Sequence, residues 1–198
     1  MRIIAGAYKG RYLKSPPSMN VRPTSDRLRE TLFNVIAPRI QDARFLDLCA
    51  GSGAVGIEAL SRGASNATFV DRSRRSCALI ESNVELCRVP EDQQAIYCSE
   101  AYEFLRQTTL PAWDIIFFDP PYKQDYIKTL EFLGAKSSKL LTEDGLLIIE
   151  HHHKTVLPET IGDLNRTRVL KQGDSSLSFY QKKTIMKPST DYTDFINK

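Results

Sequence analysis

Short apolar runs alternate with longer amphipathic stretches between Phe45 and Glu150, and this pattern predicts an α/β fold. The apolar runs are typical of buried strands, and the stretches between them have the spacing of helices. Such alternation favours a mainly parallel sheet covered by helices on both faces, with ligands at the carboxyl ends of the strands. The expected strands end at Cys49, Asp71, Cys98, Asp119 and Glu150, and the expected helices end at Arg62, Leu86, Gln107 and Ser137.

The residues before this alternation predict a small N-terminal extension. Arg2 to Ala5 and Gly10 to Lys14 are strand-like and are joined through a glycine, so they favour a hairpin. Apolar residues then recur at helical spacing from Thr24 to Ile36, and Pro38 is the expected stop. The candidate N-cap residues of this helix are Thr24, Ser25 and Asp26.

The C-terminal part departs from the alternation in a different way. Thr167 to Lys171 and Leu177 to Gln181 are strand-like and are separated only by a turn around Gly173, so we expect them to pair antiparallel. The remaining residues are polar and have no assigned role. The predicted organisation is therefore a hairpin and helix extension at residues 1–39, a main domain at 40–183 and a polar tail at 184–198.

Composition agrees with one α/β domain that has a real core. The chain has 198 residues, of which 41% are hydrophobic and 26% are charged, as is usual for a globular protein. No stretch is long and apolar enough to span a bilayer, and the apolar start is too short for a secretory signal. We therefore expect a cytoplasmic protein with no membrane partner, acting as a monomer.

Neither the cysteines nor the histidines predict a metal site. The four cysteines have no C-x-x-C spacing and fall in strand or helix patterns, so buried reduced thiols are expected. His151, His152 and His153 are consecutive on an extended segment, where successive side chains face opposite sides. His151 is expected only to border the ligand cleft. The cysteines are Cys49, Cys77, Cys87 and Cys98.

Positive charge is concentrated at the N-terminus. Residues 1–39 hold eight basic and two acidic side chains, a net charge of +6, although the whole chain carries only +3. Each arginine alone is best explained as part of a solvated surface, but the cluster, with Tyr8 and Tyr12 as possible stacking partners, favours a polyanionic nucleic acid. The candidate RNA-binding residues are Arg2, Lys9, Arg11, Arg22, Arg27 and Arg29.

The segment Asp119-Pro120-Pro121-Tyr122 follows an apolar strand and is the strongest candidate for chemistry. Two prolines fix φ and remove two backbone donors, so neighbouring carbonyls stay free to accept hydrogen bonds from a ligand. The aspartate adds another acceptor, and the tyrosine ring offers a face on which a base can stack. This arrangement can hold a flat ring that carries an amino group. A plain Asp-Pro turn is the alternative.

A second motif lies upstream, where a strand that contains Asp47 runs through a glycine loop into a helix. Glycines allow close backbone approach, and the first N–H groups of a helix favour an anionic group. The loop has the pattern G-x-G-x-x-G, which is also found in dinucleotide-binding proteins. S-adenosylmethionine fits better than a dinucleotide, because its ammonium group would lie near Asp47. The candidate loop ligands are Ala50, Gly51, Ser52 and Gly53.

Two further acids end the next strands. Asp71, with Arg72 beside it, stands where doubly wound folds place an acid against ribose hydroxyls; capping of the following helix is the alternative. Glu100, with Ala101 beside it, is a candidate for the adenine amino group, and an N-cap residue or first-turn acid of a helix is nearly as good an explanation.

In these residues taken together, the chain resembles the RsmD family of S-adenosylmethionine-dependent methyltransferases. The glycine loop and the Asp-Pro-Pro-Tyr segment resemble amino-directed methyltransferases in general, and the block from Arg22 to Asn34 narrows the resemblance to this family. It covers Arg2 to Tyr180. Cys49 stands where the family more often has Phe, and Glu100 where it more often has Asp.

The resemblance implies a fold, an activity and a partner. The implied fold is a Rossmann-like class I methyltransferase fold: a seven-stranded, mainly parallel sheet with an antiparallel last strand, plus the N-terminal hairpin and helix. The implied activity is methyl transfer to the exocyclic N2 of a guanine in 16S rRNA, within the small ribosomal subunit or an assembly intermediate. Three alternatives stay open: a DNA adenine-N6 methyltransferase, an NAD-dependent oxidoreductase and a non-catalytic RNA-binding module.

Overall fold

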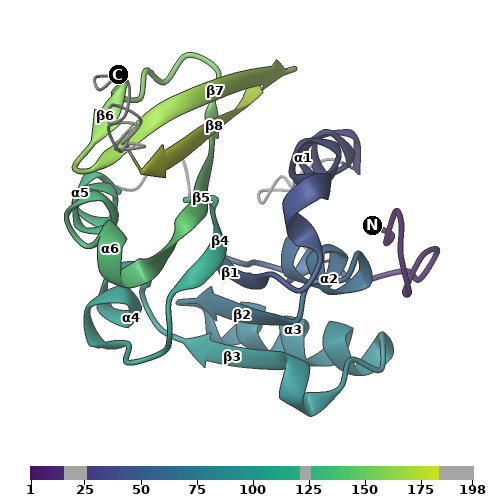
Figure 1. Ribbon diagram of the computed structural model, residues 1–198. Helices are drawn as coiled ribbons and strands as arrows, with labels where there is room; N and C mark the ends of the chain where they lie inside the picture. The colour runs from purple at the N-terminus through teal and green to yellow at the C-terminus, as the bar shows by residue number, and fades with distance from the viewer. Residues whose placement is uncertain (16–25, 121–125, 183–198) are drawn as a thin grey trace, which may run out of the picture.

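The structure, a computed structural model, describes residues 1–15, 26–120 and 126–182. These residues are built around one sheet of eight strands (Figure 1). The strand order is β3-β2-β1-β4-β5-β8-β7-β6. The strands are β1 (Arg44–Leu48), β2 (Asn66–Asp71), β3 (Gln94–Cys98), β4 (Trp113–Phe118), β5 (Leu141–His152), β6 (Thr160–Ile161), β7 (Leu164–Gln172) and β8 (Ser175–Lys182).

The pairing of these strands confirms the predicted class and corrects the strand count. Strands β1 to β5 pair in parallel, whereas β8 pairs antiparallel with β5 and with β7. The predicted number of seven is wrong, because β6 adds a two-residue strand at the edge of β7. A strand of two residues is too short to leave a hydrophobic pattern, so it could not be predicted from the sequence.

Helices cover both faces of the sheet, and each face has its own hydrophobic core (Figure 1). Residues of α1, α2 and α3 pack on one face with Phe45, Phe69 and Phe117. Residues of α4, α5 and α6 pack on the other face around Leu46 and Phe118. The helices are α1 (Asp26–Ile40), α2 (Ala54–Ser61), α3 (Arg74–Leu86), α4 (Ala101–Gln107), α5 (Ile127–Ala135) and α6 (Ser137–Leu140), with a short 3₁₀ turn, η1 (Glu91–Gln93).

Two predicted helix ends are wrong. Helix α1 continues through Pro38 to Ile40, because Ile36 and Ile40 are both buried and packing holds the last turn in place. The helix expected to end at Ser137 is two helices, since the backbone leaves helical geometry at Lys136, where φ is −117°.

The N-terminal residues form a tight hairpin-like turn that packs into the main core. Arg2 and Tyr12 form an isolated antiparallel bridge, and the Ile3 amide donates to the Arg11 carbonyl at 3.0 Å. Ile3 and Leu13 are buried in the same core as α1, α2 and α3. The extension therefore lies against the sheet domain, and its separate RNA-binding role stays a prediction.

The predicted polar tail, 184–198, lies outside the described residues. Among the helices of the described part of the chain, none has the length and apolar character that crossing a bilayer requires.

Candidate active site at the carboxyl ends of the strands

Three of the predicted acids lie on one face of the sheet, at the carboxyl ends of adjacent strands. Asp47 on β1, Asp71 at the end of β2 and Asp119 just after β4 each come two residues after a phenylalanine that packs toward α1, α2 and α3. Because side chains alternate along a strand, each acid follows its phenylalanine onto that same face. Parallel pairing of β2, β1 and β4 brings the three strand ends side by side.

Cys49 marks the point where these acids meet. Its pKa is raised by burial and then by the charges of the surrounding carboxylates. The Asp119 amide donates to the Leu48 carbonyl at 3.3 Å, so the segment after β4 lies directly beside the loop after β1. The acids that act on this half-buried thiol are Asp119, Asp71, Asp47 and Glu100.

The glycine loop between β1 and α2 is held open on the ligand side. Gly51 and Gly53 have φ values of +58° and +76°, which side chains rarely tolerate. A Cβ built on Gly51 would meet no atom within 4 Å, whereas one on Gly56 would lie 2.3 Å from the Phe69 ring. Gly51 therefore leaves room for a ligand to approach, and Gly56 lets α2 pack on the sheet. Of the other predicted loop ligands, Ala50 is half-buried, while Ser52 and Gly53 are buried.

Asp47 fixes the start of α2 against β1. It is 1% exposed, and its Oδ2 accepts a hydrogen bond from the Gly56 amide at 2.9 Å. Burial raises its pKa to about 7, with a smaller rise from Asp71, against the lowering effect of the Gly56 hydrogen bond. Positive charge near this carboxyl group would favour its ionised form. Its predicted contact with a cofactor ammonium group stays a prediction.

Asp71 ties the glycine loop to the end of β2. Its Oδ2 accepts from the Gly51 amide and its Oδ1 from the Ser73 amide, both at 2.9 Å. The alternative, that Asp71 caps the next helix, is wrong, because Ser73 is the N-cap of α3 and its side chain accepts from the Ser76 amide. A carboxylate accepts about four hydrogen bonds, so Asp71 retains acceptor capacity for a hydroxyl group.

Glu100 and Arg72 face one another at the rim. The Arg72 Nη1 lies 3.5 Å from the Glu100 Oε1, and both side chains are at least half exposed. Glu100 occupies the N-cap position of α4, as the alternative explanation expects, although its side chain makes no capping hydrogen bond there. Ala101, the first residue of α4, is half-buried.

Asp119 is in an environment that resists ionisation. Burial, then the negative charge of Glu150, then that of Asp47 raise its pKa well above the ordinary value. Pro120 is buried behind it. The other two residues of the predicted catalytic segment, Pro121 and Tyr122, lie outside the described residues.

The predicted RNA-binding residues differ in how accessible they are. Arg2, Lys9 and Arg27 are exposed, and Arg22 lies outside the described residues. Arg11 is half-buried, donates to the Cys87 carbonyl and lies with its guanidinium carbon 5.1 Å from the centre of the Tyr8 ring.

The prediction for Arg29 is wrong, because its side chain is fully buried and therefore out of reach of an RNA. Its Nη2 donates to Asp26 Oδ1 at 3.0 Å and to the Arg2 carbonyl, and its Nε lies 3.7 Å from Glu58 Oε2. Burial lowers the pKa of Arg29, and the charges of Glu58 and Asp26 oppose this. Sequence spacing placed Arg29 on the first turns of a helix but gave no sign of which face packs inward.

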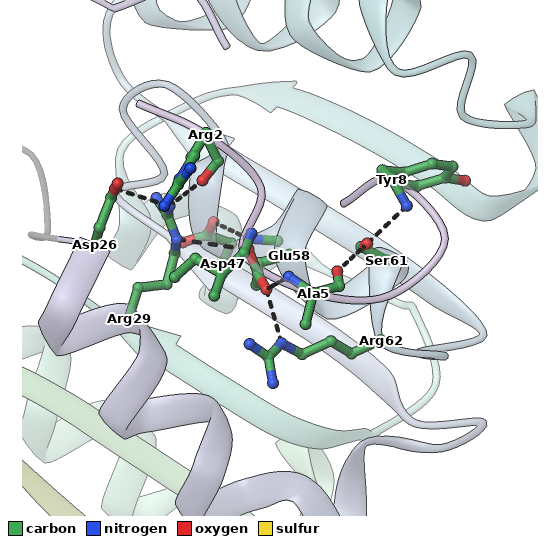
Figure 2. A network of polar contacts seen from close by, with 11 residues as sticks. Arg2, Ala5, Tyr8, Asp26, Arg29, Asp47, Glu58, Ser61 and Arg62 are labelled. Carbon is green, nitrogen blue, oxygen red and sulfur yellow. Dashed lines mark hydrogen bonds and ion pairs between the residues drawn. The ribbon is translucent and has the colours of Figure 1, made fainter. Parts of the chain in front are cut away.

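Glu58 is the centre of this network and was missed by sequence reasoning (Figure 2). Its side chain is fully buried and accepts from the Ile4 amide at 2.8 Å, the Ala5 amide at 3.0 Å and the Arg62 Nε at 2.7 Å. The network therefore attaches the N-terminal turn to α2, the helix that begins at the glycine loop. A single acid within an otherwise apolar helical run was the signal that could have revealed it.

Asn83 makes a second connection of the same kind. It is fully buried on α3, its Nδ2 donates to the Ser52 carbonyl at 2.9 Å and to the Lys14 carbonyl at 3.1 Å, and its Oδ1 accepts from the Lys14 amide at 2.8 Å. One side chain therefore joins the N-terminal segment to the glycine loop. Nothing in the local sequence distinguishes Asn83 from an exposed helix residue.

The cysteines and histidines agree only in part with the predictions. All four cysteines are free, but only Cys77 and Cys87 are buried as expected. Cys49 is half-buried, and Cys98 is exposed because it lies on the edge strand β3. His151 is buried and its Nε2 lies 2.9 Å from the Ser178 Oγ. Within the described residues there is no group of side chains that could hold a metal ion.

A cavity of about 270 Å³ lies at the opposite ends of the strands, lined by residues at the end of α1, in the turn after it and at the starts of β4 and β5. It is separate from the acids described above. Its polar lining includes Arg39, Asp114, Thr142 and Asp144.

Comparisons with known proteins point to one family. The chain is 39% identical to YlbH of Bacillus subtilis (strain 168), a candidate rRNA methyltransferase, over 92% of this chain and 100% of that protein. It is 36% identical to ribosomal RNA small subunit methyltransferase D of Escherichia coli (strain K12), over 92% of this chain and 90% of that one.

Solved structures agree. The structure of yhhF, a candidate methyltransferase from Escherichia coli, superposes with a TM-score of 0.80 at 34% identity and covers 92% of this chain and 98% of that one. The Rossmann-like methyltransferase fold is thereby confirmed, as is the resemblance to the RsmD family. A family model described as Conserved hypothetical protein 95 matches residues 1–181, and the chain belongs to that family.

Proposed function

We propose that this chain transfers the methyl group of S-adenosylmethionine to the exocyclic amino group of a guanine in small-subunit rRNA. The observation that carries the proposal is the meeting of Asp47, Asp71 and Asp119 around one loop at the strand ends. The names of the relatives, which include several small-subunit rRNA methyltransferases, supply the substrate class.

The residues of the site fit this cofactor. Gly51 has open space where a side chain would stand, so backbone can lie close to a ligand. Asp71 would accept from the ribose hydroxyls, Glu100 from the adenine amino group, and Asp47 would face the ammonium group. When bound, S-adenosylmethionine supplies a methyl group that is already activated on a sulfonium.

The protein's own contribution is to position and activate the amino group. The lone pair of guanine N2 is delocalised into the ring, which makes this nitrogen a poor nucleophile. Asp119 and the Pro120 carbonyl would accept its two hydrogens, localise the lone pair and aim it at the methyl carbon. The base must leave its stacked neighbours to reach this site, and the predicted stacking on Tyr122 would compensate for part of that cost.

The test is a methylation assay with purified chain, labelled S-adenosylmethionine and three substrates: naked 16S rRNA, small ribosomal subunits and duplex DNA. Mass spectrometry of the labelled product is expected to show N2-methylguanine in rRNA. Labelled adenine in DNA would favour a DNA adenine-N6 methyltransferase. Binding of NAD in place of S-adenosylmethionine would favour an NAD-dependent oxidoreductase. The same assay separates naked RNA from assembled subunits as the substrate.

We expect Asp71→Asn to weaken S-adenosylmethionine binding by roughly ten- to hundredfold, because a charge-assisted hydrogen bond contributes about 1.5–3 kcal/mol. Titration calorimetry measures the dissociation constant directly. The matched control is Asp163→Asn, an exposed acid in the turn between β6 and β7, which should bind the cofactor as wild type does. Equal S-adenosylmethionine affinities of the two variants would show that Asp71 does not bind the cofactor.

We expect Lys9→Glu and Arg27→Glu to weaken binding to rRNA uniformly across sequences and to reduce its salt dependence. Both side chains are exposed in the N-terminal region, and each phosphate contact that is lost removes about 0.7–0.9 from the slope of log affinity against log salt. Filter binding at several salt concentrations gives this slope. Lys139→Glu, an exposed lysine on α6 on the other face of the sheet, is the control that should leave it unchanged.

A further inference from the structure

Glu150 lies next to the transfer site, and the proposed mechanism gives it no role. It stands at the carboxyl end of β5, which pairs in parallel with β4, and Phe118 is in register with Ile149. Asp119 and Glu150 are therefore the residues that directly follow this registered pair. Each comes two residues after a core residue on the face that packs against α1, α2 and α3: Phe117 for Asp119 and Ile148 for Glu150. Two carboxyl groups thus occupy neighbouring positions on one face of the sheet.

The position of Glu150 is fixed from a third strand. It is 4% exposed, and its Oε1 accepts a hydrogen bond from the Ser175 Oγ at 3.0 Å. Ser175 begins β8, the strand that pairs antiparallel with β5 at this point. A glutamate is almost never fully buried in a protein interior unless its carboxyl group is paired, so the hydrogen bond from Ser175 helps to hold Glu150 in this position.

We propose that Glu150 is a positioning residue of the transfer site, whose buried carboxyl group, held by Ser175, controls the orientation and the charge of Asp119. The inference rests on the proposed function, because it assigns Glu150 to the reaction in which Asp119 accepts the amino hydrogens.

The physical reason is the repulsion between two adjacent carboxylates. Two such groups in a partly desolvated site ionise together only when positive charge or hydrogen-bond donors are brought to them. A guanine amino group next to a cationic methyl donor supplies both. Glu150 therefore favours the protonated form of Asp119 in the free protein. When both substrates are bound, Asp119 ionises and becomes a strong hydrogen-bond acceptor. The two carboxylates then stabilise the positive charge that develops on N2 during transfer.

The other groups that face Asp119 act in the same direction. From β1 the carboxyl group of Asp47 also raises the pKa of Asp119, and the Cys49 thiol lies beside it with its own pKa raised. The charges of Asp71 and Glu100 act on the same Cys49 thiol. From β5 itself, His151 comes next in the chain but packs against Ser178, and burial lowers its pKa, so it is neutral near pH 7.

The experiment is the pH dependence of methyl transfer, measured in single turnover with saturating S-adenosylmethionine and small ribosomal subunits. Wild type should lose activity as the pH falls, because protonated Asp119 accepts less well. In Glu150→Gln the negative charge is gone while an oxygen remains for the Ser175 hydroxyl, so the pKa of Asp119 falls. The acid limb of the profile should therefore move to lower pH. A limb at the wild-type pH, or at higher pH, would overturn the proposal.

Controls separate this inference from the proposed function and from misfolding. Glu143→Gln changes an exposed glutamate on the same strand and should leave the profile unchanged. If wild type itself transfers no methyl group to RNA, the proposed function fails; if wild type is active and the variant profile is unshifted, only the role of Glu150 fails. Should Glu150→Gln not fold, Ser175→Ala decides: it is expected to lower turnover about tenfold with unchanged cofactor affinity, and unchanged turnover would refute the role.

Discussion

Replacing Asp119 with alanine is expected to lower methyl transfer to rRNA by roughly 10²–10³-fold, the usual cost of removing one preorganised polar group from an active site. The carboxyl group stands directly after β4, beside the loop that follows β1, where it can accept from an amino group. The affinity for S-adenosylmethionine should change little, because the proposed cofactor contacts come from other strands. Single-turnover rates and calorimetry on the same preparation measure the two effects separately.

Two comparisons sharpen this prediction. Asp119→Asn keeps one oxygen acceptor without the charge and should lie between wild type and the alanine variant. Asp163→Ala removes an exposed acid far along the chain and should turn over at the wild-type rate. Turnover of Asp119→Ala within a fewfold of wild type would show that the amino group is held by other residues.

Replacing Glu58 with alanine is expected to destabilise the folded chain by about 3–5 kcal/mol, the usual cost of breaking a buried ion pair on one side. The substitution leaves the buried Arg29 guanidinium with only the half-exposed Asp26 as an acidic partner, and it removes the acceptor of the Ile4 and Ala5 amides. Urea denaturation followed by circular dichroism measures the loss as a lower midpoint. The N-terminal turn should become susceptible to proteolysis, because its attachment to α2 is lost.

A paired replacement tests whether the charges or only the packing matter. Glu58→Gln with Arg29→Met removes both charges and keeps much of the volume, so the double variant should be more stable than Glu58→Ala. Glu103→Ala, which breaks an exposed ion pair with Arg106 on α4, should leave the midpoint almost unchanged. A midpoint for Glu58→Ala equal to that of Glu103→Ala would mean that the network does not hold the N-terminal turn.

The sequence predicted the local elements better than their ends. The helix end at Gln107 and the strand end at Asp71 were predicted as observed. The strands β1 and β4 end one residue before the predicted ends, and β5 ends two residues after its predicted end. The stop at Pro38 was wrong because a proline signal is local, whereas the last turn of α1 is held by tertiary packing. The two-residue strand β6 left no pattern to find.

The candidate site was predicted only in part, because the sequence pattern shows where strands end but not which side chains pack together. Asp47, Asp71 and Asp119 were found because each follows an apolar strand, and in a parallel sheet such ends share one edge. The predicted contact of Arg29 with RNA was wrong, since spacing along a helix does not tell which arginine faces inward. Glu58, Asn83 and Glu150 were missed as parts of the site region, because their partners are distant in the sequence.

The sequence by itself determined the order of strands and helices, the acids at the strand ends and the concentration of positive charge at the N-terminus. These depend on hydrophobic periodicity and composition, which are local properties of the chain. Only the tertiary structure decided which charged groups are buried, that Arg29 pairs with Glu58, and that Glu150 stands beside Asp119. Burial and charge pairing depend on segments brought together from distant parts of the chain, and no local pattern encodes them.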